Sequence, residues 1–127
     1  MNQHIEAARL DGQTIATAGA SVACAARFEA VTKDYRLDKV KVRALTEVTC
    51  AITAGTTTFI TGPSGSGKST FLNILGLVDR PDAGRLELFG ADVTNLGDAA
   101  AADFRARNIG FIFQSFNLIP VLSLREN

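Results

Sequence analysis

Cysteine, histidine and net charge are all scarce in this 127-residue chain. Its two cysteines, Cys24 and Cys50, stand far apart, and its one histidine, His4, lies in a polar beginning, so neither a disulfide framework nor a zinc site is predicted. We expect both cysteines to pack as small apolar side chains. Lysine plus arginine and aspartate plus glutamate each number 13, which provides no general field for binding nucleic acid or an anionic membrane. An anion must therefore be bound by a local arrangement of residues.

Long apolar runs are also missing, since no stretch approaches the ~20 apolar residues that span a bilayer. The small residues of segment 14–26 suggest a signal peptide at first sight. However, Glu6 and Asp11 stand where a basic region would be, and no run of large apolar residues follows them. We expect a cytosolic chain in which residues 1–26 form a flexible N-terminal tail.

Hydrophobic residues make up 46% of the chain and charged residues 20%, which is ordinary for one globular domain. Apolar and polar residues alternate from Phe28 to Tyr35, and residues 42–52 are rich in β-branched side chains, so the two segments predict an antiparallel hairpin. Residues 57–61 and 85–89 predict two more strands. The nearly unbroken apolar run 109–113 is typical of a strand buried on both faces of a parallel sheet.

Two segments show features of helices. From Lys68 onward apolar residues recur at helical spacing until Pro81. A short helix is predicted over residues 99–106, with Asp98 as its N-terminal cap. Arg105 and Arg107 near its end could suggest a nucleic-acid patch, but solvated charges that favour the helix dipole are the simpler interpretation.

The segment between a predicted strand and a predicted helix fits the phosphate-binding pattern G-x-x-x-x-G-K-[ST]. Glycines let such a loop curl so that backbone N–H groups face an anion, and the helix directs its positive end to the same place. Lys68 would reach the β- and γ-phosphates, Ser69 would ligate Mg²⁺, and Thr70 would add a contact to the α-phosphate. The matching residues are Gly62, Pro63, Ser64, Gly65, Ser66, Gly67, Lys68 and Ser69.

A loop of this kind indicates nucleotide binding but leaves the reaction open. The alternative is a Gly/Ser-rich surface loop without a ligand, but the predicted strand before the loop and the predicted helix after it favour a phosphate site. Guanylate kinase and other nucleotide monophosphate kinases carry a very similar loop. Theirs opens the chain, whereas two strand-like segments come first here, which disfavours a phosphotransferase.

The phosphate loop is one of several segments that stand in a recognisable order along the chain: Tyr35, Val42–Leu45, Gly62–Thr70, Phe71–Gly76, Asp79–Gly84 and Ile109–Pro120. This order resembles the ATP-binding proteins of ABC transporters, most of all the subgroup serving lipoprotein release, macrolide export and cell division. The resemblance covers about residue 27 to the last residue and implies an α/β P-loop NTPase, with an ABC-type ATPase core and an N-terminal antiparallel β subdomain. Residues 27–127 would be the N-terminal part of the nucleotide-binding domain.

The resemblance implies two further site residues. Tyr35 matches the family's adenine-stacking aromatic, with an ordinary edge-strand aromatic as the alternative. Gln114 matches the glutamine that ligates Mg²⁺ and orients the attacking water, with a plain loop glutamine as the alternative. Residues 115–121 would be the connection that responds to the membrane partner, or an ordinary loop.

The family's later elements are not found after Gln114: the Leu-Ser-Gly-Gly-Gln signature, the strand ending in Asp-Glu and the switch histidine. We therefore expect a chain truncated before the helical signature region, which binds ATP and Mg²⁺ but does not hydrolyse ATP unaided. In a complete chain the resemblance implies ATP hydrolysis by two such domains, coupled to membrane-spanning permease subunits at the inner face of the membrane. A non-hydrolysing nucleotide-binding relic is the alternative.

Overall fold

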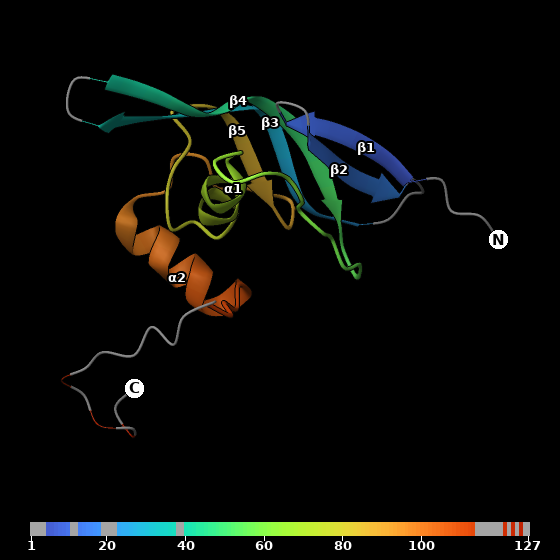
Figure 1. Cartoon of the computed structure of the whole chain (residues 1–127). Coiled ribbons are helices and arrows are strands. Elements are labelled where there is room, and N and C mark those ends of the chain that lie inside the picture. The colour runs from blue at the N-terminus through green and yellow to red at the C-terminus, as the bar shows by residue number, and fades with distance from the viewer. Residues whose placement is uncertain are drawn as a thin grey trace.

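The computed structural model describes residues 5–10, 13–18, 23–37, 40–113, 121, 123 and 125. Four strands come first, followed by a helix, two more strands and a second helix (Figure 1). Their bounds are β1 Ile5–Leu10, β2 Gln13–Ala18, β3 Cys24–Leu37, β4 Val40–Thr53, α1 Lys68–Leu75, β5 Ala83–Leu88, β6 Ala91–Asp92 and α2 Asp98–Asn108.

The main sheet has four antiparallel strands in the order β4-β3-β5-β6. The two longest strands, β3 and β4, form a hairpin, in which Phe28 pairs with Cys50 and Tyr35 with Val42. The hairpin predicted from the alternating pattern is confirmed, as is the strand predicted near residues 85–89, which begins slightly earlier as β5. These strands form the antiparallel part of the expected fold.

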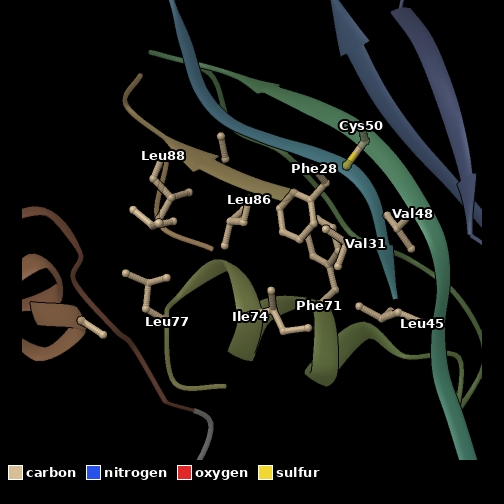
Figure 2. Packing of buried hydrophobic residues seen from close by; sticks show 13 residues of the cluster. Phe28, Val31, Leu45, Val48, Cys50, Phe71, Ile74, Leu77, Leu86 and Leu88 are labelled. Carbon is tan, nitrogen blue, oxygen red and sulfur yellow. The ribbon is translucent and has the colours of Figure 1, made fainter. Parts of the chain in front are cut away.

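One face of this sheet packs against α1, and the core lies between them (Figure 2). Phe28 from β3 and Phe71 from α1 are fully buried with their rings stacked, the centroids 4.3 Å apart. Ile74 lies one turn further along α1 and is also fully buried. The remaining members of the core come from the strands and from the segments around α2: Ala26, Val31, Leu45, Val48, Cys50, Leu77, Leu86, Leu88, Val93 and Ala101.

Residues 1–26, which the sequence predicts to be a flexible tail, contain a separate two-stranded sheet in their described part. Strands β1 and β2 pair antiparallel, Leu10 with Gln13, and both run close to β4 (Figure 1). Pairing joins the N–H and C=O groups of the two strands, and β-branched residues such as Ile15 favour the extended backbone. The two residues between the strands, Asp11 and Gly12, form a dipeptide typical of two-residue hairpin connections.

Two predicted strands are not formed. Residues 57–61 and 109–113 are both described, and neither pairs with another strand. Ile112, expected to be buried on a parallel sheet, is fully exposed at 102%. A strand is stabilised by ladder hydrogen bonds to its neighbours, and none of the described residues supplies a parallel neighbour for either segment. The prediction of a buried strand at 109–113 is therefore wrong for this chain as it stands.

Both predicted helices are present with shifted ends. Helix α1 begins at Lys68 as predicted but ends at Leu75, where the N–H of Gly76 bonds to Leu72 and the chain turns away before Pro81. Helix α2 has Gly97 as its N-cap, and the carboxylate of Asp98 contacts the guanidinium of Arg80 instead of capping the helix. Neither of the described helices has the length and apolar character to cross a membrane.

Candidate functional site

The predicted phosphate loop is irregular backbone that connects β4 to α1. Gly65 and Gly67 have φ of 79° and 86°, a left-handed conformation in which side chains other than glycine's are strained. Gly67 also lies against β4, because a Cβ atom at this position would stand 2.5 Å from the carbonyl oxygen of Ala44. The glycine thus allows the loop to pass closely over the sheet and enter α1.

Lys68 reaches back across the loop that precedes it. Its Nζ donates hydrogen bonds to the carbonyl oxygens of Gly62 at 2.8 Å and Pro63 at 2.7 Å, and to Oγ of Ser66 at 3.3 Å. The ammonium therefore joins the beginning of the loop to its end. This arrangement holds a positive charge at the loop, where it would attract a bound anion.

The beginning of α1 offers further donors for an anion. The first N–H groups of a helix have no partner within the helix. In the described structure the N-cap position of α1 is Gly67, which has no side chain to accept a hydrogen bond from these groups, and no acidic residue lies in the first turn. The loop glycines, the ammonium of Lys68 and this uncapped helix start therefore fit a bound phosphate chain.

The hydroxyl of Ser69 is a hard oxygen donor of the kind that Mg²⁺ accepts. Among the described residues there is no group of three histidine, cysteine, aspartate or glutamate side chains that could hold a metal ion by themselves. Mg²⁺ usually binds one or two protein oxygens together with phosphate oxygens, which fits a single hydroxyl beside a phosphate-binding loop.

Tyr35 lies on β3 with its phenol hydroxyl directed at the segment that follows α1. The hydroxyl donates a hydrogen bond to Oδ2 of Asp79 at 2.7 Å. Burial raises the pKa of Tyr35 and the bond to Asp79 adds to the increase, while a side-chain hydrogen bond with Thr70 acts in the opposite direction. Thr70 belongs to the first turn of α1, so the structure brings Tyr35 and the predicted phosphate site together.

Lys33 and Asp79 form an ion pair that the sequence analysis did not identify as part of the site. Nζ of Lys33 lies 2.7 Å from Oδ1 of Asp79 and donates to the carbonyl oxygen of Arg80 at 2.7 Å. Only 9% of Lys33 is exposed. A lysine in a strand two residues before Tyr35 is a weak signal, and its partner stands 46 residues further along the chain, so the sequence pattern alone cannot pair them.

Asp79 is held ionised by these contacts. Burial by itself raises the pKa of Asp79, but hydrogen bonds from Lys33, Tyr35 and the backbone amide of Arg80 outweigh it and bring the pKa below its usual value. Each carboxylate oxygen thus has its own partner, Lys33 on Oδ1 and Tyr35 on Oδ2. The result is a connected group of polar side chains beside the phosphate loop.

A cavity of about 680 Å³ lies on another side of α1 and is lined mainly by apolar side chains. Of the predicted site residues only Ser69 lines it, together with Phe113 at the end of the described stretch. Gln114, the other predicted Mg²⁺ ligand, and most of the connection 115–121 lie outside the described residues. The cavity lies beside residues 109–113 and meets the phosphate-binding motif only at Ser69.

The two arginines near the end of α2 and the two cysteines have contacts that account for them without a functional role. Arg105 donates to the carbonyl oxygen of Leu77 at 2.7 Å, and Arg107 pairs with Asp103 one turn away at 2.9 Å. Both cysteines are free, and burial raises the pKa of the Cys50 thiol to about 11, which makes it unreactive.

Comparisons with known proteins agree with this geometry. A family model described as "ABC transporter" matches residues 45–127. An uncharacterised ABC transporter ATP-binding protein of Thermotoga maritima is 50% identical over 97 residues, which cover 76% of this chain and 42% of that protein. The lipoprotein-releasing system ATP-binding protein LolD of Anaeromyxobacter dehalogenans is 46% identical over 97 residues, covering 76% and 41%. The macrolide export protein MacB of Brucella abortus is 45% identical over 101 residues, covering 80% and 16%.

The structure is similar to that of the ATP-binding cassette MJ0796, solved as a dimer in a post-hydrolysis state bound to ADP and Pi. The TM-score is 0.71 at 41% identity, and the match covers 77% of this chain and 42% of the cassette. The chain thus spans about two fifths of the length of these ATP-binding proteins. The predicted likeness to proteins of lipoprotein release and macrolide export is confirmed. This chain belongs to the ABC transporter family.

Proposed function

We propose that this chain binds ATP with Mg²⁺ as the N-terminal part, residues 27–127, of an ABC transporter nucleotide-binding domain. The observation that carries the proposal is the position of Lys68. Its ammonium is held across the loop by the carbonyl oxygens of Gly62 and Pro63, directly before an uncapped helix start. A lysine so placed can exchange part of its contacts for phosphate oxygens without moving far, and charge-assisted bonds of this kind are strong.

Each predicted site residue has a role in the proposal. Loop residues Gly62 to Gly67 surround the phosphates with backbone N–H groups, and Lys68 binds the β- and γ-phosphates. Thr70 contacts the α-phosphate, and Tyr35 stacks on the adenine ring. Ser69 and Gln114 supply oxygen ligands for Mg²⁺, which when bound neutralises phosphate charge, and Gln114 also orients the attacking water in a complete domain.

The whole protein's activity follows from the family. We propose that a complete domain hydrolyses ATP as one of a pair of such domains, and that hydrolysis drives membrane-spanning permease subunits at the cytoplasmic face of the membrane. The printed names of relatives support this, since LolD is the ATP-binding protein of a lipoprotein-releasing system and MacB is an ATP-binding and permease protein. MJ0796 is dimeric in its solved structure, which supports a paired arrangement.

Isothermal titration calorimetry with a non-hydrolysable ATP analogue and Mg²⁺ tests the proposal. Removing one charged hydrogen-bonding group costs about 1.5–3 kcal/mol, so Lys68→Ala should weaken binding about tenfold to about a hundredfold. Lys41→Ala is the matched control, because the Lys41 side chain is 60% exposed and pairs only with Asp34 in the described structure. Equal affinity of Lys68→Ala and the unaltered chain would contradict the proposed site.

A further inference from the structure

Lys33 and Asp79 fix Tyr35 from two sides. The carboxylate of Asp79 accepts the phenol hydrogen bond at 2.7 Å, and Nζ of Lys33 lies over the Tyr35 ring, 5.3 Å from its centroid. Lys33 and Asp79 are themselves bound to each other at 2.7 Å. The edge and one face of the ring therefore contact a single ion pair.

The ion pair is anchored in turn to the backbone. Lys33 donates to the carbonyl oxygen of Arg80, and the N–H of Arg80 donates to Oδ1 of Asp79 at 2.7 Å. Asp82 bonds to both neighbours of Lys33: its N–H donates to the carbonyl oxygen of Thr32 at 2.9 Å, and its Oδ2 accepts a hydrogen bond from the N–H of Asp34 at 2.7 Å. The segment after α1 is thus bound to β3 on both sides of Lys33, and the carboxylate that holds Tyr35 has little freedom to move.

We propose that Asp79, with Lys33, is a positioning residue for nucleotide binding, which holds the Tyr35 ring so that a purine base stacks on the face opposite Lys33. This inference rests on the proposed function, because it assigns a partner to the base-stacking role of Tyr35. Ordering a side chain on binding costs free energy. Because Asp79 and Lys33 already hold the Tyr35 ring in place, this cost is reduced and the affinity for the base is higher. It contributes nothing to the binding of phosphates alone.

Two ligands separate the base from the phosphates. Mg-ATP carries both, while magnesium tripolyphosphate carries only the phosphate chain. Tyr35→Phe keeps the aromatic ring and leaves the Lys33–Asp79 pair intact, and Asp79→Asn keeps the size of the anchor but removes its charge. Each variant should weaken Mg-ATP roughly two- to tenfold, the range for losing one pre-ordered side chain, and leave tripolyphosphate affinity unchanged.

The double variant Tyr35→Phe/Asp79→Asn should bind Mg-ATP about as well as the weaker-binding single variant, because both changes act on the same bond: Tyr35→Phe removes its donor, and Asp79→Asn removes the charge and one acceptor oxygen of its partner. Asp103→Asn is the control for the loss of one negative charge, since Asp103 is exposed on α2 and pairs with Arg107. It should change neither affinity. If Asp79→Asn weakens both ligands equally, or leaves both unchanged, the positioning role is overturned.

The fluorescence of Tyr35 gives a second test of its bond to Asp79. It is the chain's only tyrosine, and the chain has no tryptophan, so ultraviolet emission comes from this one phenol. A carboxylate that accepts a hydrogen bond from a phenol quenches its emission, and Asp79→Asn should therefore raise tyrosine emission in the unliganded protein. Unchanged emission would contradict the anchor independently of any ligand.

Tyr35→Ala distinguishes the inference from the function on which it rests. It should weaken Mg-ATP roughly fivefold or more while tripolyphosphate binding is retained, because stacking with the base is lost. Tyr35→Ala could weaken Mg-ATP binding in this way while Tyr35→Phe and Asp79→Asn leave it unchanged. Tyr35 would then stack on the base without the bond to Asp79, and only the inference would fail. If Tyr35→Ala leaves both affinities unchanged, the stacking role itself fails and the inference with it.

Discussion

The rings of Phe28 and Phe71 stack with their centroids 4.3 Å apart and their planes 18° from parallel. Both side chains are fully buried, one on the central strand β3 and the other three residues after Lys68 on α1 (Figure 2). This contact fixes the helix that begins at the phosphate loop to the sheet that carries Tyr35. This aromatic pair is therefore one of the contacts that join the two halves of the proposed nucleotide site, beside the bonds of Asp79 to Lys33 and Tyr35.

Phe71→Ala should lower the free energy of unfolding by about 3–5 kcal/mol, because it removes a large buried side chain and leaves a cavity next to Phe28. Leu72→Ala on the same helix is the matched control, since Leu72 is 50% exposed and its truncation should cost much less. Urea denaturation followed by circular dichroism measures both. Similar losses for the two variants would contradict the assigned packing of α1.

Gly67→Ala tests the close approach of the phosphate loop to β4. Gly55 and Gly67 have similar left-handed φ values of 72° and 86°, but only at Gly67 would a Cβ atom meet a carbonyl oxygen, that of Ala44. Gly55→Ala should cost about 1 kcal/mol for the backbone alone, as is usual for an alanine in this conformation. Gly67→Ala should cost clearly more and also weaken Mg-ATP binding. Thermal melts with equal shifts for both variants would show that the loop does not approach the strand.

Acid should destabilise the protein through its paired carboxylates. Hydrogen bonds from Arg43 and then Lys41 bring the pKa of Asp34 to about 2, and bonds from the hydroxyl and amide of Thr94 and from Arg85 do the same for Asp92. The pKa of Asp79 is lowered as well. A carboxyl whose pKa is lower in the folded state contributes stability above its unfolded pKa of about 3.9, and this contribution is lost as the pH falls through the folded pKa.

The unfolding free energy should therefore be level near neutral pH and fall between about pH 4 and pH 2. Asp79→Asn should make this fall shallower, since one of the linked protons is removed. A wild-type protein whose stability rises on acidification through this range would contradict the assigned ion pairs.

The apolar face around residues 109–113 should cause self-association. Ile112 is fully exposed and Phe113 is 56% exposed, and both line the apolar cavity beside α1. Ile112→Lys should reduce concentration-dependent light scattering while changing the unfolding free energy by no more than about 0.5 kcal/mol, as expected of a surface substitution. Val40→Lys is the control, since Val40 is 63% exposed at the far end of the hairpin. If both substitutions reduce light scattering equally, exposed apolar area anywhere on the surface causes the self-association, and the face around residues 109–113 has no special role.

Local signals predicted the parts of the fold that depend on neighbouring residues. The alternation around Phe28 predicted β3, and the switch to helical spacing at Lys68 placed the start of α1 correctly. The phosphate loop was recognised because its glycine positions are set by backbone angles that few other residues adopt.

Signals that depend on distant partners were misleading or absent. Residues 109–113 have the composition of a buried strand, but a strand forms only where another strand pairs with it, and none of the described residues does so here. The bond between Tyr35 and Asp79 joins positions 44 residues apart, and no local pattern identifies such a pair. The pairing of β1 with β2 was not predicted, although the sequence between the two strands, Asp-Gly, is common in short hairpins.

The central claim is that the backbone amides between Gly62 and Thr70 bind the phosphates of a nucleotide. Two-dimensional NMR of the ¹⁵N-labelled chain, titrated with a non-hydrolysable ATP analogue and Mg²⁺, measures this directly. The account predicts that the largest amide shifts occur at Gly65, Gly67 and Lys68, and that the same loop shifts in Lys68→Ala need about tenfold to about a hundredfold more ligand to saturate. Saturable shifts confined to other parts of the chain, or no shifts at all in folded protein, would contradict it.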